Sequence, residues 1–492
     1  MKRSCIALFL ITFSTFLLTA SGHLDVIDEY MIFFQAESLA LNGSLAVPQA
    51  VEHDTWYGRE GVDGQPYTGY GPAHAWAVVP FYYLGRTTAA ILDIPEQHRD
   101  LIFYWGALLS NCFLAALLAL LFHYLLCRLH VSLRISFAAS LGLVFATPVW
   151  PYTGTLFSEI WTALLLLAAL IFLERTIRQG QTGFSSVMCC GTCLGLALMS
   201  RPNHGAAIPV FAIALMMAPL SRALRVRQVL LLGAVTTLFL GATLGLNYLH
   251  FHDVFQFGYA DQVEGGKILT QFNTPTHLGL YGLFLSPGKS LFLFVPLVLL
   301  ALAGQPLLWR HSRPLATVCS GCMLVYALFL AHHTQWEAGY SWGPRYLLPV
   351  VPLLLVGMAP LLRKTHLNWP RRALVVLCLV GVLVNLPAVF TSSYEVQTTG
   401  DYYDENYVYR MGHNAVVEQW NLFLHYLGGA LRGKTLESPL HQGLDLWWVT
   451  LMKDGVPPLL MLLGISLATL AGLTGGMLLL GSARHKKKGG QP

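Results

Sequence analysis

Two adjacent acids, Asp28 and Glu29, follow shortly after the first apolar segment of the chain and open a long polar loop. A carboxylate held within hydrogen-bonding reach of a hydroxyl can act as a general base toward it. A membrane protein can position such a carboxylate at one face of a helix bundle without a soluble domain. The pair is therefore the best catalytic candidate in the sequence, and the alternative is two ordinary solvated loop acids.

The elements that position this pair are membrane helices. Of the 492 residues, 55% are hydrophobic and 11% are charged, and the mean hydropathy is +0.55, which a water-soluble core could not hide. Apolar segments of about 20 residues can cross a bilayer. We predict an all-α polytopic membrane protein with about 12 transmembrane helices, beginning near Ile6, Leu101, Ile135, Ile160, Phe184, Ala206, Val229, Ser290, Leu315, Tyr346, Ala373 and Val456.

The basic residues orient these helices. If the apolar stretch Ala73 to Leu92 is a juxtamembrane or re-entrant helix, most Lys and Arg residues face the cytoplasm and Glu174 is the only acid there. Both termini are then cytoplasmic. Residues 1–22 resemble a signal peptide, but an uncleaved anchor is favoured. The net charge of +5 resides in short loops and in the basic tail 481–492, which fits contact with membrane lipids and implies no nucleic acid.

The informative polar sequence lies in outer loops at residues 22–100, 250–288, 332–345 and 391–455. None is long or patterned enough to form an independent domain, so residues 1–492 are read as a single membrane domain. The last loop leaves room for a small lid. Within it, Val416 to Leu431 can form an amphipathic helix on the bilayer surface.

Several stretches together resemble a known family. They are Asp28–Tyr30, Ala36–Leu45, Asp63–Tyr67, Tyr70–Pro72, Pro80–Gly85, Gly282–Phe292 and Trp336–Pro349, the last with Gly343-Pro344-Arg345-Tyr346 at its core. In this order they resemble GT-C superfamily membrane glycosyltransferases. The likeness is to bacterial relatives of the protein O-mannosyltransferases and the aminoarabinose transferases, that is, to family 39.

The resemblance implies a glycosyltransferase that moves a sugar from a polyprenyl-phosphate donor to an extracytoplasmic acceptor by inverting displacement. The acceptor class, whether lipid, glycan or protein, stays open. In the family the first-loop aspartate is the general base, and Asp28 is the matching position, with Glu29 orienting the acceptor or supporting Asp28. The implied location is the bacterial inner membrane, with the active site facing the periplasm.

A lipid phosphate leaving group calls for preorganised cations. Lys289 and Arg345 each stand at the outer start of a predicted span, and Arg201 occupies an outer turn. We predict that these three bind the donor phosphate. The alternative for each is snorkelling to lipid headgroups.

Six further residues are predicted to line the substrate site, and each has an ordinary alternative. They are Tyr70, His74, Glu159, His332, His333 and Glu337. Tyr70 and His74 fit an interfacial aromatic belt equally well. Glu159 fits a helix-end carboxylate. The two adjacent histidines with Glu337 leave a divalent metal possible, although an interfacial hydrogen-bonding role is favoured. The sequence itself requires no cofactor.

Other functions remain open. A protein with twelve spans is often a secondary transporter or flippase, here for an amphipathic or lipid-linked solute, but such proteins usually carry repeats or charged residues in mid-span. The predicted span centres contain almost none, which favours the transferase. A glycan polymerase or ligase with a similar outer site is the third candidate.

Overall fold

The chain folds into a helical bundle in a computed structural model that describes residues 2–259, 272–364, 368–399, 414–433, 443–456 and 458–488. The strands in this part of the chain are β1 (Gly58–Glu60) and β2 (Pro66–Thr68), which form one antiparallel hairpin with Arg59 opposite Tyr67. The all-α prediction is confirmed.

Eight helical stretches in the described residues are long and apolar enough to cross a membrane. They are α1 (Lys2–Thr19), η1 with α5 (Glu96–His98, Arg99–Arg128), α8 (Glu159–Gln179), α11 (Arg222–Phe251), α15 (Arg313–His332), the run from η5 to α17 (Arg345–Arg363), α18 with α19 (Trp369–Asn385, Pro387–Phe390) and α23 (Pro458–Lys488). Three shorter apolar stretches are α6 (Leu133–Phe145), α9 (Phe184–Ser200) and η3 with α10 (Pro202–Ala206, Ala207–Met216). The protein is therefore an integral membrane protein, while the number of twelve spans stays a prediction.

The span predicted to begin near Ser290 is interrupted. It consists of α13 (Leu291–Phe294) and α14 (Leu297–His311), separated at Pro296, and it follows α12 (Thr276–Leu285). Proline lacks the N–H that would continue the helical hydrogen bonds, so the break is expected from the sequence. The run from η5 (Arg345–Val350) through α16 (Val351–Leu355), η6 (Val356–Met358) and α17 (Ala359–Arg363) is broken in a similar way by Pro349, Pro352 and Pro360.

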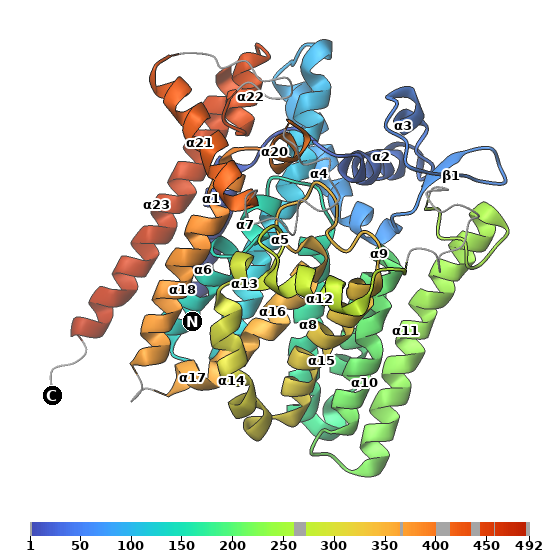
Figure 1. Ribbon diagram of the computed structural model, residues 1–492, viewed down its shortest axis with the longest axis vertical. Helices are drawn as coiled ribbons and strands as arrows, with labels where there is room; N and C mark the ends of the chain where they lie inside the picture. Colours follow the sequence, from blue (N-terminus) through green and yellow to red (C-terminus); the bar gives the residue numbers. More distant parts are fainter. Residues whose placement is uncertain are drawn as a thin grey trace.

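The predicted outer loops gather at one end of the bundle. Figure 1 shows α2 (Ile27–Asn42), α3 (Pro48–Glu52), α20 (Ser393–Thr399), α21 (Ala415–Leu431) and α22 (Trp447–Lys453) at this end, and the start of α1 and the end of α23 away from it. The helix α21 coincides with the amphipathic segment predicted there. Parts of the predicted loops 250–288 and 391–455, the end of the basic tail 481–492 and residue 457 lie outside the described residues, so the lid stays a prediction.

The predicted juxtamembrane stretch forms α4 (Pro72–Ile91), which packs against α2 and α5. It does not meet the criteria of length and hydropathy that define the eight spans. Gly85 faces Gly106 so closely that a Cβ atom on Gly85 would lie 2.7 Å from the Ile102 carbonyl oxygen. This contact brings α4 against α5, and the apolar side of α2, including Phe33, packs on Tyr82 of α4 and Leu108 of α5. These contacts fix the first turn of α2.

Candidate active site

The pair Asp28-Glu29 occupies the first turn of α2, where the partial positive charge of the helix N-terminus stabilises acids. Consecutive residues of a helix point about 100° apart. The two neighbours therefore face different surroundings. Asp28 points toward arginines, whereas Glu29 accepts a hydrogen bond at Oε2 from the main-chain N–H of Leu156 at 3.1 Å.

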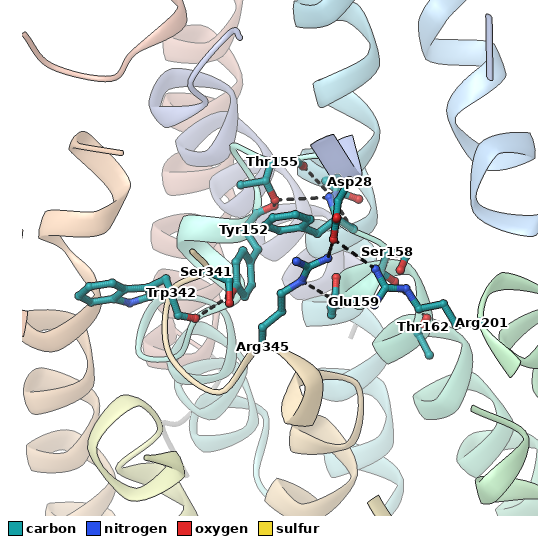
Figure 2. A network of polar contacts seen from close by, with 12 residues as sticks. Asp28, Tyr152, Thr155, Ser158, Glu159, Thr162, Arg201, Ser341, Trp342 and Arg345 are labelled. Atoms are coloured by element: carbon teal, nitrogen blue, oxygen red, sulfur yellow. Dashed lines mark hydrogen bonds and ion pairs between the residues drawn. The ribbon is translucent and has the colours of Figure 1, made fainter. Parts of the chain in front are cut away.

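Asp28 belongs to a charge cluster with Glu159, Arg201 and Arg345. Arg345 is central: its Nη2 donates to Asp28 Oδ2 at 2.7 Å and its Nε donates to Glu159 Oε1 at 2.9 Å. Arg201 lies 3.8 Å from the same oxygen of Asp28 and 3.5 Å from Glu159. Figure 2 shows Arg345 between the two acids, with Arg201 approaching from the other side. Two acids and two arginines make the cluster neutral. The attraction between opposite charges therefore offsets much of the cost of removing them from water.

Breaks in the helices aim both arginines at the cluster. Arg201 follows α9 in an extended conformation, with φ of −151°, before η3 begins at Pro202. Arg345 begins η5 after Gly343, whose φ is +61°. A side chain at position 343 would be strained by that φ and would also meet the ring of Phe294 at 2.8 Å. Loop geometry, not helix periodicity, therefore sets the direction of both guanidinium groups.

Aromatic rings enclose the two guanidinium groups. The Cζ atom of Arg345 lies 3.5 Å from the ring centre of Phe157, and that of Arg201 lies 4.9 Å from the ring centre of Tyr70. Tyr346 lies within 5.8 Å of both. The π-faces attract the cations and exclude water, which strengthens the charge interactions inside the cluster.

Asp28 is the member of the cluster that a substrate can reach. Its side chain is 25% exposed, against 3% for Glu159, 4% for Arg345 and 9% for Arg201. Burial would raise the pKa of Asp28, but Arg345 and Arg201 outweigh it and hold the pKa below its ordinary value, helped by a hydrogen bond from Tyr70. Asp28 is therefore an accessible, ionised carboxylate.

Glu29 lies in a contrasting environment of other acids. Its side chain is buried, and burial followed by the charge of Asp25 raises its pKa well above the ordinary value. Nearby, His23 bridges Asp25 at 3.1 Å and Asp445 at 2.8 Å, and Ser392 donates to Asp25 at 2.6 Å. Burial lowers the pKa of His23, but the two aspartates outweigh it and raise the pKa well above 6.5. The bridge ties the first outer loop to the last one.

Lys289 holds the loop that leads to Arg345. Its buried ammonium group donates to the carbonyl oxygens of Gly339, at 2.9 Å, and of Ser341. Burial lowers the pKa of Lys289 to about 7, against the opposing charge of Glu337. These contacts favour a positioning role, and phosphate binding by Lys289 stays a prediction.

The remaining predicted residues divide between the site and its periphery. His74 is buried on α4, its ring faces Trp161, and burial with the charge of Arg201 lowers its pKa to about 3, so it is neutral. His332 bonds Thr276 at 2.8 Å, and His333 accepts from the Gln335 N–H at 3.0 Å. Neither histidine makes a described bond to the charge cluster.

The described part of the chain contains no group of side chains arranged to bind a divalent metal. No three His, Cys, Asp or Glu side chains there are arranged to hold an ion. This includes His332, His333 and Glu337, the set from which the sequence left a metal possible.

Two pockets, both partly open to solvent, adjoin the aromatic rings that enclose the arginines. One is lined by Glu29, Phe157, the His23 bridge and residues 391–394. The other is lined by Tyr70, Pro202, the hairpin around Tyr67 and the outer end of α11. The first pocket is therefore acidic, and the second contacts a helix that exposes apolar side chains.

No family model and no curated protein matches the sequence, but solved structures match the fold. The crystal structure of ArnT from Cupriavidus metallidurans bound to undecaprenyl phosphate has a TM-score of 0.50 at 16% identity and covers 96% of this chain and 76% of that one. The chain has the GT-C fold.

Two other GT-C structures match less closely. ArnT from the same organism in the apo state gives a TM-score of 0.46 at 16% identity, covering 96% of this chain and 75% of that chain. The oligosaccharyltransferase of Archaeoglobus fulgidus in the apo form gives 0.46 at 12% identity, covering 83% and 60%. The resemblance found in the sequence is confirmed at the level of the fold by the ArnT structure bound to undecaprenyl phosphate.

The GT-C fold brings together Asp28, Tyr70, Glu159, Arg201 and Arg345, all of which the sequence singled out. Sequence reasoning missed the His23–Asp25–Asp445 bridge. His23 and Asp25 stand beside Asp28 in the chain, which was an available signal, but their partner is more than 400 residues away. It also missed Phe157, because an apolar residue at a span edge has no distinctive sequence context.

Proposed function

We propose that this protein is a glycosyltransferase that transfers a sugar from a polyprenyl-phosphate donor to a hydroxyl-bearing acceptor at the outer face of the bacterial inner membrane. The observation that carries the proposal is the exposure pattern of the charge cluster. Its two arginines and Glu159 are buried, and Asp28 is the accessible carboxylate at its edge. A base beside preorganised cations is what displacement of a phosphate leaving group requires.

Asp28 takes the proton in the proposed reaction. The acceptor oxygen forms a bond to the anomeric carbon as its proton passes to Asp28. The bond from that carbon to the phosphate oxygen breaks, and the polyprenyl phosphate leaves with the electron pair. A single displacement of this kind inverts the anomeric configuration. Glu159, buried and bonded to both arginines, keeps them aimed at the leaving phosphate.

Donor binding and base activation are coupled in this arrangement. Arg345 and Arg201 both approach Oδ2 of Asp28, so a donor phosphate competes with Asp28 for the same guanidinium groups. While paired, Asp28 is a weak base because its pKa is lowered. A phosphate that draws the arginines away raises that pKa. The base therefore gains strength when the donor is in place.

The cavity beside Tyr70 and Pro202 suits the start of the prenyl chain. It includes Leu246, Phe251 and Phe257, and it opens beside α11, which stands at the edge of the bundle in Figure 1 and exposes many apolar side chains. A lipid tail can enter from the bilayer along this helix while its phosphate lies near Arg201. The undecaprenyl phosphate in the similar ArnT structure supports a lipid of this class.

Transfer by purified protein tests the proposal. The protein in lipid nanodiscs is mixed with undecaprenyl-phosphate glucose, mannose or aminoarabinose and with envelope extract as a source of acceptor. Mass spectrometry then measures released undecaprenyl phosphate and acceptors that have gained one sugar. We expect release with at least one donor. If no donor reacts while the reconstituted protein moves lipid-linked sugar across a vesicle bilayer, the protein is a flippase and the proposal is wrong.

A further inference from the structure

The cavity on the Glu29 side of the cluster has the chemistry of a sugar-binding pocket. Carboxyl and hydroxyl groups alternate along it with aromatic rings, among them Tyr340, Trp342 and Tyr394. Ring faces stack on the C–H surfaces of sugars, and carboxylates accept from their hydroxyl groups. The walls come from the first outer loop, the segment 151–157, the loop before Arg345 and the last outer loop, so the pocket exists only when distant parts of the chain meet.

The charge of this pocket excludes anions. Asp25, Glu29 and Asp445 line it with His23, and none of the lining residues is lysine or arginine. His23 neutralises part of the charge by bridging the two aspartates. A phosphate in this cavity would meet carboxylates without a compensating lysine or arginine, which is costly in a partly dehydrated site.

Glu29 offers the pocket a carboxyl oxygen that can form a hydrogen bond with a ligand. Its side chain is 2% exposed, and Oε2 is occupied by the Leu156 N–H. Among the described residues, Oε1 has no hydrogen-bond partner, although Glu29 lines the cavity. Oε1 can therefore exchange a hydrogen bond with a sugar hydroxyl group, which both donates and accepts.

The pocket also shares a wall with the charge cluster. Phe157 lines the cavity and stacks against the guanidinium group of Arg345, and Glu29 is the chain neighbour of Asp28. A sugar held in the pocket therefore contacts the chain neighbour of the proposed base and a ring that stacks on Arg345.

We propose that this pocket binds the acceptor through a sugar unit that carries no negative charge, and that an amino sugar binds more tightly than its neutral counterpart. The proposal rests on the proposed transferase function. Glu29 is then an acceptor-binding residue, and the last outer loop takes part in acceptor recognition through Tyr394 and Asp445.

Three small probes test the charge rule: methyl glucoside, methyl glucosaminide and methyl glucoside 6-phosphate. Saturation-transfer NMR on the protein in nanodiscs measures their binding without any need for turnover. We expect signals from the neutral and amino probes, about threefold tighter binding of the amino probe, and no signal from the phosphate.

Two matched variants test which of the two pockets binds the sugar probes. Ala388→Trp fills the acidic pocket, and Leu246→Trp fills the cavity beside α11. We expect Ala388→Trp to remove the sugar signals and keep undecaprenyl phosphate binding, and Leu246→Trp to do the reverse. If one variant loses both ligands, its thermal unfolding shows whether it is still folded. Ser393→Phe, a second substitution that fills the acidic pocket, then repeats the test.

The outcomes separate the two proposals. Equal binding of the phosphate probe, absence of every sugar signal, or sugar signals that persist in both Ala388→Trp and Ser393→Phe would overturn the acceptor pocket. If undecaprenyl phosphate itself fails to bind the wild-type protein, the proposed transferase function fails instead.

Discussion

Asp28 and Glu29 are neighbours in one helical turn, yet their carboxyl groups lie in opposite surroundings. Asp28 faces Arg345 and Arg201, and its pKa is lowered, so it stays charged. Glu29 faces Asp25 and lacks an arginine within hydrogen-bonding distance among the described residues, and its pKa is raised, so its protonated form is favoured. An acidic pair in a sequence therefore does not define two equivalent catalytic groups.

The difference divides the outer face into two sides. The Asp28 side is a neutral network of full charges that suits a phosphate leaving group. The Glu29 side is acidic, rich in hydroxyl groups, and suits an uncharged or cationic sugar. A substitution on the Asp28 side should therefore change stability and donor binding in a different way from a substitution on the Glu29 side. Equal effects on both sides would contradict the division.

The largest effect is expected from Arg345→Met. It leaves Glu159 buried without its closest partner and removes a phosphate ligand, so we expect transfer to fall below detection and the free energy of unfolding to drop by roughly 3–5 kcal/mol. Thermal unfolding and the transfer assay measure the two effects. Arg128→Met is the matched control, since Arg128 pairs with Glu174 at 3.0 Å but is 33% exposed, and we expect a loss of at most about 1 kcal/mol. Equal losses of unfolding free energy in both variants would show that the buried charge cluster contributes no more to stability than a partly exposed ion pair.

A smaller effect is expected from Arg201→Gln. Arg201 contacts the same two acids at longer distances, so its removal should cost less stability than that of Arg345. Loss of a charge-assisted contact to the donor phosphate should raise the Kd for undecaprenyl phosphate roughly 10-fold to 100-fold. Binding to nanodisc-held protein measures this. An unchanged Kd would remove Arg201 from the donor site.

Glu29→Gln should affect stability in the direction opposite to Asp28→Asn. The raised pKa of Glu29 gives stability that is fully present below its ordinary pKa and is lost as the pH rises toward the raised value. Gln mimics the protonated acid, so the variant should be as stable as wild type at pH 4 and more stable at pH 8. The lowered pKa of Asp28 gives stability that is present above its ordinary pKa and is lost as the pH falls, so Asp28→Asn should cost most near neutral pH. Unfolding temperatures of both variants at pH 4 and pH 8 would show the same trend if the two acids were equivalent.

The smallest effect is expected from His23→Gln. The bridge from His23 to Asp25 and Asp445 gives stability that is fully present below pH 6.5 and is lost as the pH rises through the raised pKa of His23. The variant should unfold at a lower temperature than wild type at pH 6, and the difference should shrink at pH 10. A difference that is the same at both pH values would mean that the bridge contributes no charge interaction.

The sequence predicted much of the site because membrane topology restricts where charged residues can lie. Arg201 and Arg345 lie on the outer side, whereas most Lys and Arg residues face the cytoplasm, and the structure pairs both of them with Asp28 and Glu159. Lys289 also lies on the outer side, but it donates to the loop at Gly339, and the path of that loop could not be predicted from the sequence. The opposite surroundings of Asp28 and Glu29 could not be predicted, since they depend on Leu156 and Arg345 reaching the first turn of α2 from distant segments.

The most direct test of the central claim is the transfer rate of Asp28→Asn together with its affinity for undecaprenyl phosphate. If Asp28 is the base, the rate should fall by about 10²-fold to 10⁴-fold, and the affinity should stay the same or rise, because Asp28 no longer competes for Arg345 and Arg201. Transfer at the wild-type rate would contradict the assignment of Asp28, and a large loss of lipid affinity would show that its role is to hold the arginines and not to accept the proton.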